Sequence, residues 1–200
     1  ELPPESRERV LRAGRASCYW ATYRMGDAER EHKELVTRYP HLPNVHYCYG
    51  VFLLPDQPDT ALEEFRRELG ISPSHVRARL QIAFEYIRRN EHAAGLPFAE
   101  EAVRLDPASF AAHNALGRIL LETGHVEGAV RELEEGVRLA PDSPETRYAL
   151  SRAYDRAGRK QDAAQERTEF ARLDKLRRGM EEESPSAVPQ QADRSDRPPI

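Results

Sequence analysis

Apolar residues recur along most of the chain at spacings of three and four, in stretches of about a dozen residues that are separated by short polar turns. Between residues 112 and 137 this spacing continues on both sides of Gly124, which is typical of two amphipathic helices joined by a turn. Glycine readily adopts the left-handed conformation that ends a helix, so Gly124 and Gly158 mark predicted helix ends. Short turns make neighbouring helices antiparallel. The pattern therefore predicts an all-α chain of helical hairpins.

The hairpin repeats with a period of 34 residues. Leu116-Gly117 aligns with Ile82-Ala83 one period earlier and with Leu150-Ser151 one period later. A one-residue deletion near Pro55 and Pro58 carries the alignment toward the N-terminus. Five units then follow one another without a gap: 9–42, 43–75, 76–109, 110–143 and 144–177. A fixed period of this length predicts stacked helix pairs that gain stability from their neighbours.

Two positions in every unit carry a small residue. The first column holds Ala16, Gly50, Ala83, Gly117 and Ser151, and the second holds Ala28, Ala61, Gly95, Ala129 and Ala163. Small side chains let two helices approach each other closely while larger neighbours fill the space beside them. We therefore expect both columns in the joint within each pair. A leucine at Gly117 or Ala129 would overpack that joint at a cost on the order of 1–3 kcal/mol.

These residues carry a family resemblance. The pattern of one unit consists of Leu116, Gly117, Leu120, Gly124, Ala129, Leu133 and Pro141. It resembles the tetratricopeptide repeat, and the resemblance covers roughly residues 9–177. It implies a right-handed α-solenoid with a concave groove lined by the first helix of each unit. The sequence departs from the family's preference for a large aromatic residue at four positions: His32, His113, Arg147 and Arg167.

The resemblance also implies which side chains face a ligand in the groove. The predicted groove residues are Trp20, Asn44, Tyr47, Arg77, Phe84, Arg88, Asn114, Arg118, Tyr148, Arg152 and Arg156, with Ser17, Val51, Leu80 and Leu121 in neighbouring slots. Aromatic faces and guanidinium donors together suit a peptide with apolar and acidic groups. The alternative is structural, because the apolar members can pack helix against helix and the arginines can pair with glutamates one turn away.

One ligand class of the family is not expected. Its binders of chaperone tails hold a terminal carboxylate with a Lys and an Asn four residues apart. The equivalent pairs here are Leu80/Phe84, Asn114/Arg118 and Tyr148/Arg152, so that clamp is not reproduced.

The two ends of the chain differ in character. Residues 1–8 read as a lead-in to a repeat domain at 9–178, although the helical pattern itself extends over 5–23. No polar capping unit precedes the first pair, so we expect further repeats or another domain before Glu1 in the natural protein. The last helix is predicted to end at Gly179. Residues 179–200 contain four prolines and many Ser, Gln and Asp residues, a composition typical of a disordered tail.

Composition narrows the function without naming it. The net charge of the 200 residues is −4 and no basic tract occurs, which argues against nucleic acid as a partner. The longest apolar runs have about four residues, far fewer than the roughly 20 that a membrane-spanning helix needs. The compartment stays open: cytoplasmic, or periplasmic or secreted if a leader was removed upstream. The oligomeric state stays open as well.

Catalytic signatures are missing from the sequence. It has no nucleotide-binding glycine loop, no metalloprotease helix and no nucleophile elbow, and no cofactor is predicted. His41, His46 and Cys48 are metal-capable residues close together, but their spacing matches no common zinc pattern. His46 also shares a repeat position with His113, which favours a packing role.

The leading interpretation is a non-enzymatic scaffold that holds a partner's peptide or helix in the concave groove. One alternative is a regulatory or assembly arm of a larger protein whose other domain precedes residue 1. The other is a metal-dependent enzyme built around His41, His46 and Cys48.

Overall fold

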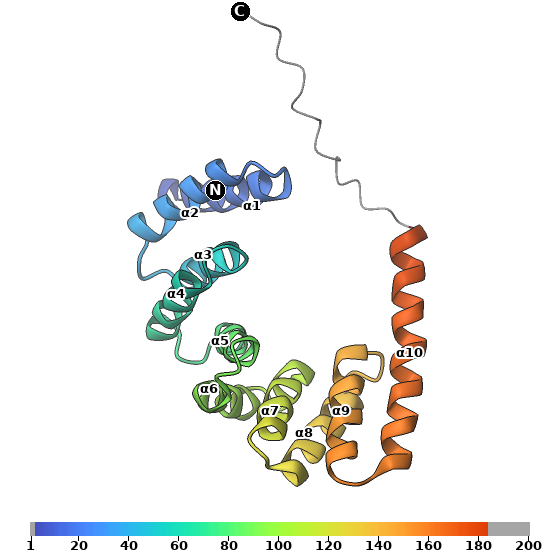
Figure 1. Ribbon diagram of the computed structural model, residues 1–200. Coiled ribbons are helices and arrows are strands. Elements are labelled where there is room, and N and C mark those ends of the chain that lie inside the picture. Colours follow the sequence, from blue (N-terminus) through green and yellow to red (C-terminus); the bar gives the residue numbers. More distant parts are fainter. Residues whose placement is uncertain (1–2, 184–200) are drawn as a thin grey trace, which may run out of the picture.

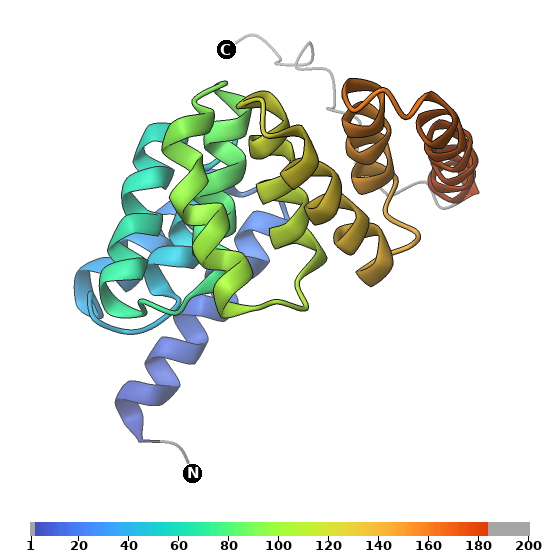
Figure 2. The ribbon, with the colours of Figure 1, turned by 90° about the horizontal axis from the view of Figure 1, so that it is seen from below.

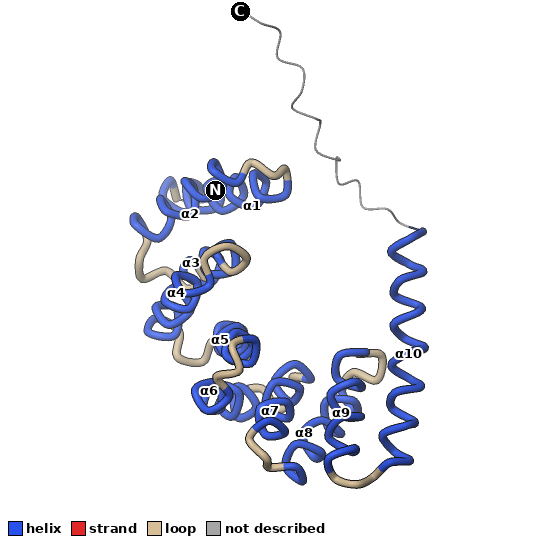
Figure 3. The backbone as a smooth tube through the Cα atoms, in the orientation of Figure 1, coloured by secondary structure: helices blue, strands red, loops and turns tan. Residues whose placement is uncertain are grey.

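A computed structural model describes residues 3–183, and within these residues the chain folds into ten helices joined by short loops (Figure 3). The helices are α1 (Pro4–Ala21), α2 (Met25–Arg38), α3 (Val45–Leu53), α4 (Pro58–Ile71), α5 (Val76–Arg88), α6 (His92–Leu105), α7 (Phe110–Glu122), α8 (Val126–Leu139), α9 (Pro144–Arg156) and α10 (Lys160–Glu183). Each repeat predicted from the sequence contains one antiparallel pair, so the five-unit reading of the chain is confirmed.

The pairs stack along an arc (Figure 1), in which the first helix of each pair faces inward and the second helix of the first four pairs faces outward. Each helix packs on the next one in the chain, and α5, α7 and α9 also contact one another directly across the units. A view at 90° shows the start of α1 projecting from the stack (Figure 2). The predicted all-α solenoid is therefore confirmed. No helix between residues 3 and 183 combines the length and hydrophobicity that crossing a membrane requires.

The turn inside four of the pairs is built in the same way. Gly124 and Gly158 have φ angles of 85° and 77°, and Tyr23 and Asn90 occupy the same repeat position with φ angles of 57° and 58°. The next residue donates its N–H to a carbonyl five residues back, as in the 2.8 Å bond from His125 N to the oxygen of Leu120. This bond closes the end of the first helix. The second pair has no such residue because α3 is shortened where the sequence has its deletion.

The two columns of small residues lie in the joint within each pair, as predicted. All of their alanines are fully buried. A Cβ atom at Gly117 would lie 2.5 Å from Cγ of Leu133, and one at Gly50 would lie 2.6 Å from the Phe65 ring. Real Cβ atoms do not approach other atoms this closely, so these joints admit no side chain at all.

A polar arrangement that we call the clasp recurs where the family prefers an aromatic residue. In the fourth unit, His113 Nδ1 lies 2.8 Å from the Glu132 carboxylate on α8, and Nε2 lies 3.0 Å from the carbonyl oxygen of Pro107, just after α6. In the fifth unit, Arg147 makes the equivalent bonds to Glu166 (2.8 Å) and to the carbonyl oxygen of Pro141 (2.7 Å). The clasp therefore ties both helices of one unit to the end of the preceding one.

The second unit repeats the clasp with His46, Glu64 and the carbonyl oxygen of Pro40, at 2.5 and 3.0 Å. In the first unit, Arg12 pairs with Glu31 at 3.1 Å. The third unit breaks the series, because Phe98 stands where the other units have the carboxylate. There the Arg79 Nη1 atom is buried without a hydrogen-bond partner. Four of the five units thus carry a polar tie at this position.

Both ends depart from the expected boundaries. Helix α1 begins at Pro4, so most of the expected lead-in 1–8 is helical. Helix α10 continues through Gly179 to Glu183, which corrects the predicted stop at that glycine. A glycine inside a helix costs only about 1 kcal/mol, and the arginines, methionine and glutamates around it favour helix. The rest of the predicted tail, residues 184–200, lies outside the described residues.

Candidate functional site

The inner face of the arc carries most of the predicted groove residues, and its character changes along the stack. One repeat position shows the change most clearly. From the first unit to the fifth it holds Ser17, Val51, Phe84, Arg118 and Arg152. Because equivalent residues of successive units face the same side, this column runs from small through apolar to cationic. The inner face therefore has an apolar half and a cationic half.

The apolar half contains a depression of about 560 Å³ between α1, α3 and α5. Trp20, Val51 and Phe84 line it, together with Leu54, Pro55, Pro58, Gln81, Glu85 and Arg88. The Trp20 side chain is 37% exposed, and its ring meets the edge of Phe52 at a centroid distance of 5.9 Å. Aromatic surface that is held in place but left open is suited to contact with apolar groups.

Arg88 at the rim of this depression is tied to its own helix. Its Nε and Nη2 atoms donate to the two carboxylate oxygens of Glu85 at 2.8 and 2.6 Å. Arg89 donates to the same carboxylate. Hydrogen bonds from Arg88, and then from Arg89, hold the pKa of Glu85 below its usual range. Arg88 therefore pairs with a glutamate one turn away, as the structural alternative predicts, although its side chain stays exposed.

The cationic half is organised by one carboxylate. Glu122, at the end of α7, accepts hydrogen bonds from Arg152 at 2.7 Å and from Arg156 at 3.0 Å, both on α9. Arg156 also donates to the carbonyl oxygen of Leu121. Both arginines keep more than two fifths of their side chains exposed. This pairing spans two units, so it also fixes the position of the guanidinium groups on the inner face.

Arg118 lies one helical turn before Glu122 and differs from its neighbours. Among the described residues it forms no hydrogen bond and no ion pair, yet its side chain is partly buried. Burial lowers the pKa of its guanidinium, the charge of Arg152 lowers it further, and the charge of Glu122 offsets this only in part. Arg152 and Arg156 are thus paired with the one carboxylate of Glu122, and Arg118 beside them has no ion pair of its own.

Two predicted groove residues of this half have different roles. Asn114 is only 5% exposed, and its side-chain amide donates to Thr146 Oγ1 at 3.1 Å. It is a buried link between the fourth and fifth units, which corrects its expected place at the groove surface. Tyr148 is 49% exposed and packs against Phe170 of α10 at a centroid distance of 5.4 Å.

The predicted residues of the second and third units sit near the α3–α5 joint. Tyr47 contacts the rings of Phe65 and His75, and its backbone N–H donates to the buried Glu68 carboxylate. The Asn44 side-chain oxygen accepts a 2.9 Å hydrogen bond from His75 Nε2. Arg77 is exposed. Leu80 and Leu121, from the neighbouring slots, are buried and belong to the core.

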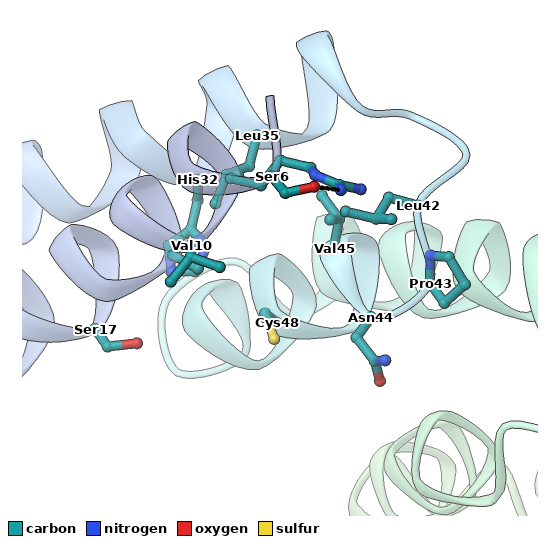
Figure 4. A pocket seen from close by; sticks show the side chains of 12 residues that line it. Ser6, Val10, Ser17, His32, Leu35, Leu42, Pro43, Asn44, Val45 and Cys48 are labelled. Atoms are coloured by element: carbon teal, nitrogen blue, oxygen red, sulfur yellow. Dashed lines mark hydrogen bonds between the residues drawn. The ribbon is translucent and has the colours of Figure 1, made fainter. Parts of the chain in front are cut away.

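A second cleft opens between α1 and α3, which barely contact each other. Figure 4 shows it: Val10 and Ser17 of α1, His32 and Leu35 of α2, and Val45 and Cys48 of α3 are among the residues around a volume of about 480 Å³. Ala13 explains the gap, because the equivalent residues of the later units are Tyr47, Leu80, Asn114 and Tyr148. The small side chain leaves unfilled the place that a larger one occupies elsewhere.

Sequence reasoning missed Glu122 as the centre of the cationic half. Its signal was nevertheless present, because Glu122 follows Arg118 by four residues and shares the repeat position of Arg88 and Arg156. An acidic residue between two arginines of the same column marks the place where neighbouring units exchange an ion pair. Ala13 was also missed, and its signal is a small residue in a column of large ones.

Nothing in the geometry of residues 3–183 supports the metal-site alternative. Both ring nitrogens of His46 are engaged in the clasp. Within residues 3–183, no three His, Cys, Asp or Glu side chains come together in a way that could hold a metal ion. Cys48 instead faces the cleft between α1 and α3.

Comparison with known proteins agrees with the repeat pattern. Residues 86–145 match the family model of the tetratricopeptide repeat. The chain contains tetratricopeptide repeats. The match falls on the third and fourth units, and the same helix-pair architecture continues in the units on either side of it.

Solved structures similar to this tetratricopeptide stack include several forms of MamA. MamA 41-end from Desulfovibrio magneticus RS-1 has a TM-score of 0.73 and 20% sequence identity, covering 84% of this chain and 96% of that one. An RS-1 MamA double mutant gives a TM-score of 0.74 at 20% identity, with the same shares of the two chains covered. Another MamA structure gives 0.71 at 14% identity, covering 92% of this chain and 97% of that one. The likeness establishes a shared fold. No curated protein sequence matched the chain.

Proposed function

We propose that this tetratricopeptide stack is a non-enzymatic scaffold that holds a segment of a partner protein against its inner face. The fold supports a role in protein interaction in general terms, since stacked helix pairs create an extended concave surface. The observation that carries the proposal is the cationic half, where Arg152 and Arg156 pair with the single carboxylate of Glu122 and Arg118 has no ion pair. Unmatched guanidinium groups favour a partner that brings carboxylates.

Aromatic side chains define the rest of the partner's chemistry. Trp20, Phe84 and Tyr148 are held by neighbouring rings or helices without being fully covered. A partner with apolar and acidic side chains would cover the rings and neutralise the arginines. Binding of this kind brings proteins together without transforming a substrate.

The test is charge reversal on the inner face. Arg118→Glu combined with Arg152→Glu should reduce partner binding at least tenfold, because two attractive charges become repulsive. The matched control is Arg104→Glu with Arg138→Glu, two exposed arginines on the outer helices α6 and α8. Proteins that the unaltered chain captures from its source cells should be retained by the control and lost by the inner-face variant, with dissociation constants measured for each purified partner. Equal capture by the two variants would refute the proposal.

A further inference from the structure

The apolar depression and the cationic cluster lie on one face in a fixed order. The depression is built from α1, α3 and α5, and the cluster (Arg118, Arg152, Arg156 and Glu122) is built from α7 and α9. The residues of the depression come from the first three units, and those of the cluster come from the fourth and fifth units. A partner segment that uses both must therefore carry its apolar and acidic side chains in separate blocks.

The column of Val51, Phe84, Arg118 and Arg152 sets the distance between the blocks. First helices of neighbouring units pack at roughly 10 Å from axis to axis. Val51, at the centre of the depression, lies in the second unit and Arg118 lies in the fourth, so roughly 20 Å separates the two positions. An extended chain advances about 3.3 Å per residue, which corresponds to about six residues over that span.

Charge complementarity identifies the acidic end of the partner. The partner-free surface leaves Arg118 without a hydrogen-bonded anion and near the like charge of Arg152, which the charge of Glu122 offsets only in part, and an incoming carboxylate would relieve this. Glu122 already holds Arg152 and Arg156, so the open position is the one at Arg118. The apolar half has no comparable surplus, because Arg88 is bound to Glu85 and Arg89 is bound to both Glu85 and Asp59.

We propose that the inner face recognises an extended partner segment with two parts, an apolar side chain seated over Trp20, Val51 and Phe84 and a carboxylate on Arg118, about six residues apart. This inference rests on the proposed function and adds to it the order and the spacing of the partner's side chains. Specificity then comes from the distance between the two parts, since neither part alone covers both halves.

The test begins with selection from a random library of 16-residue peptides displayed on phage, using the whole chain as bait. Enriched sequences should carry Trp, Phe, Leu or Ile about six positions from Asp or Glu. A synthetic peptide from the enriched set is then measured by fluorescence anisotropy. Lengthening or shortening its spacer by three residues should weaken binding about tenfold, because only one part can then be engaged.

Substitutions made in the peptide and in the protein together test whether the peptide's carboxylate contacts Arg118. Replacing the peptide's Glu or Asp by the corresponding amide should weaken binding to the unaltered chain, yet have little effect on Arg118→Gln, since the partner charge is already gone. Arg104→Gln, at an exposed arginine on the outer helix α6, is the matched control and should behave like the unaltered chain.

The possible failures are distinguishable. Enriched peptides that bind independently of spacer length, or that respond equally in Arg118→Gln and the unaltered chain, would overturn the two-part inference while leaving a groove-binding scaffold intact. A library that yields no peptide sensitive to Phe84→Ala or to Arg118→Gln would remove both the inference and the proposed function.

Discussion

Individual residues in this stack are constrained most tightly where two helices of one unit meet. At Gly117 there is no room for even a methyl group, because its Cβ would lie 2.5 Å from the branch carbon of Leu133. Gly14, in the middle of α1, has nothing within 4 Å of the same position. The two glycines are both helical, so they form a matched pair that separates packing from helix propensity.

Gly117→Ala should lower the free energy of unfolding by about 1–3 kcal/mol, since Leu133 must leave its rotamer or α7 and α8 must separate. Gly14→Ala should raise it by about 0.5–1 kcal/mol, because alanine favours helix and meets no neighbour. Urea denaturation followed by circular dichroism measures both. A stabilising Gly117→Ala would show that the joint is not closely packed.

His32 has a buried ring in an apolar position. It shares its repeat position with Phe65, Ala99 and Leu133, and it packs against the rings of Tyr49 and Phe52 with neither nitrogen hydrogen-bonded. Burial lowers the pKa of His32 to about 4. Since an unfolded histidine has a pKa near 6.5, the unfolded chain takes up a proton at this site at a higher pH than the folded chain does.

Stability should therefore fall as the pH drops from about 6.5 toward 4, by up to about 3 kcal/mol from this one group. His32→Leu should remove that part of the pH dependence. The measurement is the difference in unfolding free energy between the two proteins at pH 7 and at pH 5, which cancels the contributions of other groups. A difference that does not change with pH would contradict a neutral buried His32.

The sequence predicted the helix pairs, the columns of small residues and the left-handed turns at Gly124 and Gly158, because each follows from local spacing and backbone preference. It did not predict that Asn114 is buried against Thr146 or that Glu122 gathers two arginines of α9. Those contacts join residues 30 to 34 positions apart. Their direction depends on the rotation between units, and the repeat period does not specify that rotation.

At the scale of the element, the clasp replaces an aromatic contact by a polar tie. His113 directs Nδ1 at the Glu132 carboxylate and Nε2 at the Pro107 carbonyl oxygen. Arg147 fills the same position in the next unit with a permanent charge. This equivalence implies that histidine and arginine can replace each other as hydrogen-bond donors at this position.

His113→Arg should keep the unfolding free energy within about 1 kcal/mol of the original, since both donors are retained. His113→Leu should cost about 1–3 kcal/mol, because Glu132 and the Pro107 carbonyl oxygen lose their partner. Thermal and urea unfolding of the two variants provide the comparison. An equal loss of unfolding free energy in both variants would mean that packing of the His113 ring, and not its two hydrogen bonds, sets the stability of this joint.

At the scale of the whole molecule, successive units differ in how closely they pack against one another. Helix α7 touches both α5 and α9 across the units, whereas α1 and α3 leave the cleft beside Ala13 between them and α3 and α5 have little direct contact. In a stack, the stability of each unit depends mainly on its nearest neighbours. The first unit has a neighbour on one side among the described residues, and its contact with that neighbour is the weakest.

Native-state hydrogen exchange should therefore be fastest in α1 and α2 and slowest in α7 and α8, with a difference of at least tenfold in protection. Ala13→Leu, which fills the cleft, should slow exchange in α1 and α2 and leave the last two units unchanged. Mass spectrometry of exchanged peptides resolves the units. Uniform protection along the chain would contradict a stack with a loose first joint.

Because the clasp has the same register in the fourth and fifth units, residues 110–143 could pack against a second copy of themselves. His113 bonds to the carbonyl oxygen of Pro107, and Arg147 bonds to that of Pro141 in the same register. A duplicate of residues 110–143 inserted after position 143 would thus present its histidine to the existing Pro141 and offer its own terminal proline to Arg147. The fourth unit is in this sense an interchangeable module, from which longer arrays with a deeper curve could be assembled by simple tandem duplication.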